Sequence, residues 1–369
     1  MVKALVPKPV LYVVHSYYKQ QSTRFNPVHF RSNEMPLPKY LSLAFTLRCR
    51  AVCPHCYLLQ ENKNLFKSNE QVNGSLLRSI FRSPSGQTIK SLSCGGGEAL
   101  LHPDFFELLD IPIAAGVKHI QVVTNGMSLM DDDITQRIIK EHKKLNNIQI
   151  SMDATNHDDY VKTKGIKNCN FKGLCNNIKK ITAATRENLK LAVVISFVIN
   201  PENISKVPSM VDFATNLGAD ECQFLNIHVV KSDESGHVSY GKDFLHTEYK
   251  QLMESADYDI NISIQPPLVE EYLDYYCKSL ESLLFVSPSG KLSPCSHIPW
   301  NKEYGSLQDN RENPQDIPKS REMKKQFIDA FQKKDSNLLP EVCKFCNKRA
   351  KGLFKFDSEQ KKWHFFYLH

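Results

Sequence analysis

Short apolar runs that recur through the middle of the chain limit its fold more than any other feature. The strands they predict are Leu41–Phe45, Ile89–Ser93, His119–Thr124, Ile148–Met152, Leu191–Val198 and Glu221–Ile227. The helices predicted between them include Phe105–Ala115, Asp133–Lys144, Leu174–Arg186 and Ser205–Leu217. Strands about 30 residues apart with helices between them are typical of βα units in a parallel sheet. Six units predict an α/β fold, a partial (βα)6 TIM-like barrel instead of the full eight.

Three regions of different character follow from this pattern. Residues 1–40 lack a long period and are predicted to be an N-terminal extension with one short strand near Leu11–Val14. Residues 41–260 carry the barrel, and the polar segment Lys231–Gly241 near its end is typical of a loop or lid. Residues 261–369 contain short strands, Pro266-Pro267 and a turn at Pro288–Lys291, which predict a smaller C-terminal domain.

Composition excludes several classes of protein. The net charge of +7 comes from 47 basic and 40 acidic residues without a dense basic block, so a nucleic-acid partner is not expected. No apolar stretch approaches the ~18 residues of a membrane span, and no signal peptide is recognisable. We therefore expect a cytoplasmic protein whose 11 cysteines are reduced. Clustered cysteines in that compartment indicate metal or catalytic ligands.

Three of the cysteines, Cys49, Cys53 and Cys56, follow the first predicted strand at a C-x3-C-x2-C spacing. Thiolates favour zinc, copper(I) or iron–sulfur clusters. A structural zinc site needs four ligands, so zinc would require His55 or a distant residue as the fourth. A [4Fe–4S] cluster held by three cysteines instead leaves one iron open for another ligand. The triplet alone leaves both alternatives open.

A glycine-rich segment follows the second predicted strand, in the stretch Ser93-Cys-Gly-Gly-Gly-Glu-Ala-Leu-Leu-His-Pro-Asp104. Thr124-Asn-Gly126 ends the third strand, and Ser151-Met-Asp153 ends the fourth. A C-x3-C-x2-C triplet followed by GGGE and these segments resembles the radical S-adenosylmethionine (radical SAM) superfamily over roughly residues 41–230.

The resemblance implies cofactors and a role for each matching residue. Cys49, Cys53 and Cys56 would ligate a [4Fe–4S] cluster whose open iron binds S-adenosylmethionine. The residues expected to contact that cosubstrate are His55, Gly95, Gly96, Gly97, Glu98, Asn125, Ser151 and Asp153. One electron from the cluster would cleave the cosubstrate to a 5′-deoxyadenosyl radical, which abstracts a substrate hydrogen. A flavodoxin or ferredoxin is the expected electron donor.

Four further cysteines lie late in the chain, with Cys277 and Cys295 spaced C-x12-G-x4-C and Cys343 and Cys346 spaced C-x2-C. Alone they would equally suit a four-thiolate zinc site. Beside the first motif they resemble the auxiliary-cluster domain called twitch, a shortened SPASM domain, and imply a second [4Fe–4S] cluster. With all four ligands supplied by protein, that cluster would transfer electrons, which suits a net oxidation.

The predicted function is that of a radical SAM oxidoreductase that cross-links or dehydrogenates a peptide, as maturases of ribosomally made peptides do. Only 48 residues precede Cys49, so we expect any leader-peptide-binding domain to be a separate partner protein. One alternative is a dehydrogenase or epimerase of a small molecule such as a sugar or aminocyclitol. An alternative from another class is a non-catalytic zinc and nucleic-acid-binding protein.

Overall fold

The computed structural model describes residues 37–56, 58–59, 64, 68–186, 191–200, 202–226, 249, 251–254, 257–265, 283–293, 295, 305–307, 321–322, 325–326, 329–330, 333, 335–339 and 352–367. The strand expected near Leu11–Val14, the loop Lys231–Gly241 and the cysteines Cys277, Cys343 and Cys346 lie outside the described residues.

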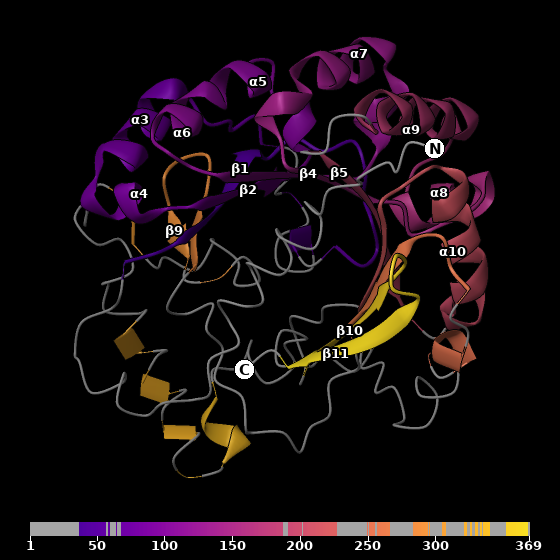
Figure 1. The fold of residues 1–369 in the computed structure, drawn as a ribbon. Coiled ribbons are helices and arrows are strands. Elements are labelled where there is room, and N and C mark those ends of the chain that lie inside the picture. The colour runs from indigo at the N-terminus through magenta and orange to yellow at the C-terminus, as the bar shows by residue number, and fades with distance from the viewer. Residues whose placement is uncertain are drawn as a thin grey trace, which may run out of the picture.

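A curved sheet with parallel strands at its centre forms the framework, and the helices lie along its convex side (Figure 1). The six predicted strands are adjacent and parallel in chain order: β1 (Tyr40–Thr46), β2 (Ser91–Gly96), β3 (His119–Thr124), β4 (Asn147–Ser151), β5 (Ala192–Ile199) and β6 (Glu221–Asn226). This arrangement confirms the α/β class and the partial-barrel order predicted from the sequence.

Strands from the C-terminal part of the chain extend both edges of the same sheet. They are β7 (Asn261–Ile264), β8 (Leu283–Val286), β9 (Leu292–Ser293), β10 (Gly352–Asp357) and β11 (Lys362–Tyr367). β7 pairs parallel with β6 and β8 parallel with β1, while β10 and β11 form an antiparallel hairpin beside β7. The domain boundary at residue 260 stays a prediction, and the strands beyond it are hydrogen-bonded to the barrel.

The helices match the predicted positions with differences that have local causes. The α-helices are α3 (Gly74–Arg82), α4 (Pro84–Thr88), α5 (Phe105–Leu108), α6 (Asp110–Ala114), α7 (Asp132–Glu141), α8 (His157–Lys164), α9 (Phe171–Thr185) and α10 (Val207–Asn216). The 3₁₀ helices are Ala99–Leu101, Met127–Met130, His142–Lys144, Ile204–Lys206 and Ser336–Leu338. The helices α3, α4 and α8 were not among those named from the sequence pattern.

The single helix predicted over Phe105–Ala115 is two short helices, because Pro112 has no amide hydrogen for the carbonyl of Leu108. A proline also explains the late start of α10, which carries Pro208 in its first turn after a 3₁₀ segment. The β2 strand runs further than predicted, since Gly95 and Gly96 still pair with β1.

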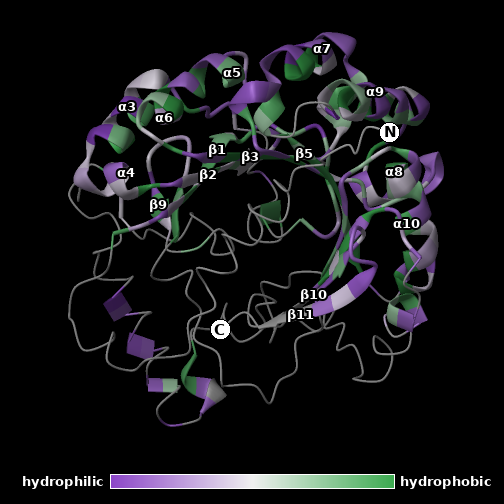
Figure 2. Ribbon diagram, in the orientation of Figure 1, coloured by the Kyte–Doolittle hydropathy of each residue, from purple (hydrophilic) through white to green (hydrophobic). Residues whose placement is uncertain are grey.

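The two faces of the sheet differ in polarity. Side chains toward the helices form one apolar core that includes Val122, Ile150, Ile195 and Phe224. Figure 2 shows hydrophobic residues along the strands that lie beneath the helices. Residues that alternate with them point to the concave side and are mostly polar. A closed barrel of this kind is filled with branched apolar side chains, so the polar concave wall is suited to water and ligand instead of a packed core.

No helix in the described part of the chain is both long enough and apolar enough to cross a bilayer.

Substitution of Phe105 tests how the helices pack on the sheet. Its buried ring packs against Phe45 of β1, with ring centroids 4.9 Å apart. We expect Phe105→Ala to lower the free energy of unfolding by about 3–5 kcal/mol, because it leaves a cavity between α5 and β1. Ile113→Ala on the neighbouring helix removes a side chain that is 40% exposed. This control should change the free energy of unfolding by less than about 0.5 kcal/mol. Urea denaturation measures both, and equal effects would contradict this packing.

Candidate active site

The segments singled out in the sequence meet where the parallel strands end. Cys49 follows β1, Glu98 follows β2, Asn125 follows β3 and Asp153 follows β4. The side-chain amide nitrogen Nδ2 of Asn125 lies 3.4 Å from the Sγ of Cys49. Nε2 of His55 lies 3.4 Å from Oδ2 of Asp153. Four separate loops therefore form one cluster at the carboxyl edge of the sheet.

The three glycines at the end of β2 have different roles. A Cβ on Gly97 would lie 2.4 Å from the carbonyl oxygen of Arg48, and one on Gly96, which has φ +108°, would lie 2.7 Å from that of Thr46. These two glycines let β2 approach the start of the cysteine loop, to which Gly97 N and Glu98 N donate hydrogen bonds. A Cβ on Gly95 would meet no heavy atom within 4 Å, so open space lies beside Gly95.

The carboxylate of Glu98 is buried and joins the ends of β2 and β3. Its oxygens accept hydrogen bonds from Oγ1 of Thr124 at 2.7 Å and from the backbone N–H of Asn125 at 2.9 Å. Burial raises the pKa of Glu98, and these donors oppose that effect. Contact between Glu98 and the ammonium group of a cosubstrate stays a prediction.

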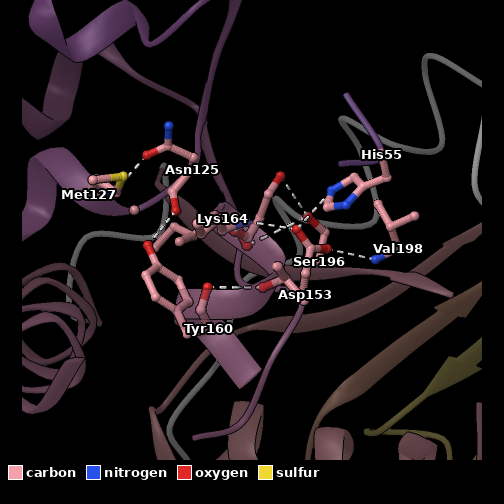
Figure 3. Close-up of polar contacts among 12 residues, drawn as sticks. His55, Asn125, Met127, Asp153, Tyr160, Lys164, Ser196 and Val198 are labelled. Atoms are coloured by element: carbon pink, nitrogen blue, oxygen red, sulfur yellow. Dashed lines mark hydrogen bonds and ion pairs between the residues drawn. The ribbon is translucent and has the colours of Figure 1, made fainter. Parts of the chain in front are cut away.

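A buried ion pair stands at the end of β4. Asp153 has φ +59°, a left-handed conformation that aspartate tolerates better than most residues. Its Oδ2 lies 2.7 Å from Nζ of Lys164, and its Oδ1 accepts the backbone N–H of Val198 on β5 at 2.8 Å (Figure 3). Burial would raise the pKa of Asp153, but Lys164 and then His55 hold it well below its usual range. The carboxylate is therefore charged and stabilised on three sides.

Lys164 was missed by sequence analysis, although it organises the site. Its side chain is only 1% exposed, and Nζ also donates to the carbonyl oxygen of Ser151 at 2.6 Å. The one available signal was Gly165 directly after it, since glycine often ends a helix. Nothing in the local sequence indicated that a lysine in the last turn of α8 would turn inward.

The end of α8 also fixes the cysteine loop. Val52, which lies between Cys49 and Cys53, donates its backbone N–H to the carbonyl oxygen of Lys164 at 2.9 Å. Gly165 has φ +61°, and a Cβ there would lie 2.2 Å from the carbonyl oxygen of Val52. The cysteine loop and α8 are thus in direct backbone contact, which only glycine permits.

Ser151 belongs to a row of hydrogen bonds on the concave wall. Its Oγ lies 3.4 Å from Oγ of Ser196 on β5, and Nε2 of Gln149 donates to the same Ser196 oxygen at 3.3 Å. Nε2 of Gln121 on β3 donates to Oε1 of Gln149 at 2.7 Å. This wall presents hydroxyl and carboxamide groups beside the cysteine loop.

The three cysteines of the loop have the chemistry of cluster ligands. Burial raises the pKa of Cys49 to about 12 and that of Cys53 to about 11, and it raises the pKa of Cys56 as well. Free thiols here are neutral at pH 7, so their thiolates need a bound cation for stability. Within the described ranges no three His, Cys, Asp or Glu side chains converge on one point that could hold a single metal ion. A [4Fe–4S] cluster binds each thiolate through a different iron, and three thiol side chains on one loop are the donor set that it needs.

Of the four late cysteines, only Cys295 is described. It is buried directly after β9, and its carbonyl oxygen accepts a hydrogen bond from Oγ of Ser293 at 2.9 Å. The assignment of Cys277, Cys295, Cys343 and Cys346 to a second cluster stays a prediction.

Comparison with known proteins finds a similarity to one family over most of the barrel. Residues 43–214 match the Radical SAM superfamily, and this range includes the cysteine loop and every residue expected to contact the cosubstrate. Radical SAM enzymes bind S-adenosylmethionine at a [4Fe–4S] cluster, in agreement with the thiol chemistry of the loop.

Several proteins are similar to this chain over most of its length. The subtilosin biosynthesis protein AlbA of Bacillus subtilis is 24% identical over 75% of this chain and 59% of AlbA, so the chain spans about three fifths of that relative. The PqqA peptide cyclase of Granulibacter bethesdensis is 22% identical over 85% of this chain and 80% of the cyclase. A probable GTP 3′,8-cyclase of Methanocaldococcus jannaschii is 23% identical over 70% of this chain and 78% of the cyclase.

Solved structures support the fold. SuiB of Streptococcus suis with bound S-adenosylmethionine superposes with a TM-score of 0.56 at 15% identity, over 78% of this chain and 70% of SuiB. The protein anSMEcpe with bound AdoMet superposes with a TM-score of 0.57 at 18% identity, over 78% of this chain and 83% of anSMEcpe.

Gly165→Ala tests the backbone contact between α8 and the cysteine loop. The added methyl group would meet the carbonyl of Val52, so we expect the loop to be displaced and cluster loading to fall severalfold. Gly116→Ala is the matched control, because Gly116 has a similar positive φ of +86° but no heavy atom within 4 Å of its Cβ. Iron and sulfide analysis after anaerobic reconstitution measures loading. Equal loading in the two variants would show that the contact does not position the cysteines.

Proposed function

We propose that this chain is a radical SAM oxidoreductase that forms a cross-link or a double bond in a peptide substrate. The observation that carries the proposal is the C-x3-C-x2-C loop, whose half-buried cysteines lie beside Gly96, Gly97 and Asn125 at the carboxyl edge of the barrel. When bound there, the cluster and S-adenosylmethionine supply one-electron chemistry that generates a 5′-deoxyadenosyl radical and removes a hydrogen from the substrate.

The chain's own residues would position the reactants and exclude water. Cys49, Cys53 and Cys56 would hold the cluster, and the open space beside Gly95 is suited to the cosubstrate. His55, Asn125, Ser151 and the buried Asp153–Lys164 pair surround the same position. Because Asp153 and Lys164 neutralise each other, they shape the site without adding net charge to it.

The polar side chains on the concave wall favour the proposal of a peptide substrate. A peptide backbone presents N–H and C=O groups, and the row Gln121–Gln149–Ser196 offers partners for both. Similar structures also favour a peptide substrate, since SuiB has been crystallised with precursor peptide SuiA and anSMEcpe with the Kp18Cys peptide. AlbA takes part in bacteriocin biosynthesis, and another relative is a peptide cyclase.

Further components complete the proposal. Cys277, Cys295, Cys343 and Cys346 would hold an auxiliary [4Fe–4S] cluster that accepts the electron released by oxidation of the substrate radical. A flavodoxin or ferredoxin would reduce the first cluster, and a separate protein would bind a leader peptide. A nucleotide or sugar substrate is the second candidate, favoured by the similarity to the probable GTP 3′,8-cyclase.

The first test concerns the cluster and the cosubstrate. Reconstituted protein should hold about eight irons per chain and release 5′-deoxyadenosine when dithionite and S-adenosylmethionine are added. Cys53→Ala should abolish this release and retain about four irons, those of the auxiliary cluster. Cys175→Ala, on α9, is the control and should keep both properties. Full release by Cys53→Ala would refute the assignment, and about four irons in the wild type would remove the auxiliary cluster.

The second test concerns the substrate. We expect a precursor peptide, encoded near the gene for this chain, to accelerate 5′-deoxyadenosine release and to lose two hydrogen atoms per modification. Mass spectrometry detects the loss, and deuterium carried from the labelled peptide into 5′-deoxyadenosine shows which hydrogen is taken. Acceleration by GTP or a sugar, with no change in the peptide, would favour the second candidate.

A further inference from the structure

All four polar groups of Asn125 make hydrogen bonds, and three of these bonds are to groups outside the cysteine loop. Its backbone N–H donates to Oε2 of Glu98 and its carbonyl oxygen accepts from the hydroxyl of Tyr160, both at 2.9 Å. Its side-chain oxygen Oδ1 accepts the backbone N–H of Met127, also at 2.9 Å, which closes an Asx turn (Figure 3). The residue is therefore fixed by segments from β2, α8 and its own loop.

These bonds also decide which end of the carboxamide faces the cysteine loop. The N–H of Met127 needs an acceptor, and only the oxygen of the carboxamide can provide it. The amino group Nδ2 must then point the other way, where it lies 3.4 Å from Sγ of Cys49. The donor is thus oriented toward the sulfur before any cluster binds.

The surroundings of Cys49 make this donor important. The Cys49 sulfur is half-buried near the carboxylate of Glu98 and the sulfurs of Cys53 and Cys56, and the backbone N–H of Ala51 is a second donor to it. Burial and negative neighbours disfavour negative charge on the sulfur. An N–H directed at the sulfur favours negative charge instead, and hydrogen bonds to cluster sulfurs are a principal control of the reduction potential.

We propose that Asn125 sets the reduction potential of the SAM-binding cluster by hydrogen bonding to the Cys49 thiolate. The proposal rests on the proposed function, because it needs a [4Fe–4S] cluster in the loop. Reduction adds negative charge to the cluster, which the N–H···S bond stabilises, so Asn125 makes the cluster easier to reduce. Asn125 is a positioning residue in this role, since it acts on the cluster through its ligand.

Asn125→Asp is the sharpest test. It preserves the shape of the side chain and the acceptor for the Met127 N–H, but it replaces the donor to Cys49 with an oxygen. Asn125→Ala removes the donor without adding charge. Asn170→Ala is the matched control, because Oδ1 of Asn170 also accepts a backbone N–H, that of Gly173 at 2.9 Å, and it does so at the start of α9.

The measurement is a redox titration of the reconstituted full chain, followed by electron paramagnetic resonance with and without S-adenosylmethionine. At a fixed potential, the ratio of reduced to oxidised cluster should fall about tenfold in Asn125→Ala, which equals about 59 mV for one electron. The fall should be larger in Asn125→Asp and absent in Asn170→Ala. The signal that disappears in Cys53→Ala identifies the cluster.

Three outcomes would overturn the proposal. One is an unchanged potential in both Asn125 variants with the cluster fully loaded. Another is a shift that occurs only when S-adenosylmethionine is present, which would place the effect on the cosubstrate. The third is failure of both variants to load a cluster that Asn170→Ala still loads, which would make Asn125 an assembly residue. Absence of any cluster from the wild type would instead refute the proposed function.

Discussion

The buried ion pair between Asp153 and Lys164 is the interaction on which the arrangement of the site most depends. It joins the end of β4 to the last turn of α8, and through Oδ1 of Asp153 it reaches the backbone of β5. The backbone of Lys164 accepts the N–H of Val52 in the cysteine loop. A buried charge that loses its partner is strongly destabilising, so neither residue can be replaced alone without disturbing all four segments.

Around this pair, the site is built from close backbone contacts more than from side chains. Gly96 and Gly97 bring β2 against the beginning of the cysteine loop, and Gly165 brings α8 against its middle. Glu98 and Asn125 then connect the ends of β2 and β3 to the same loop. Cluster ligands must be held in fixed positions, and these contacts provide that rigidity from three sides.

The two faces of the sheet separate stability from function. The convex face carries the apolar core beneath the helices, where Phe45 and Phe105 pack together. The concave face carries Gln121, Gln149 and Ser196, whose hydrogen bonds add little apolar burial but offer polar groups to a ligand. Substitutions on the two faces should therefore have different effects, on folding in one case and on substrate in the other.

The sequence by itself determined the order of the βα units, the cysteine spacing and the glycine-rich segment, because strand periodicity and ligand spacing are local properties. It also placed Cys49, Gly97, Asn125 and Asp153 after successive strands, and parallel strands necessarily end at one edge. Only the tertiary structure decided that Lys164 turns inward to Asp153, that Gly165 meets Val52, and that Asn125 directs its N–H at Cys49. Val52 and Gly165, for example, are 113 residues apart in the chain (165 − 52). No local sequence pattern specifies such a contact, because it depends on how separate loops pack together.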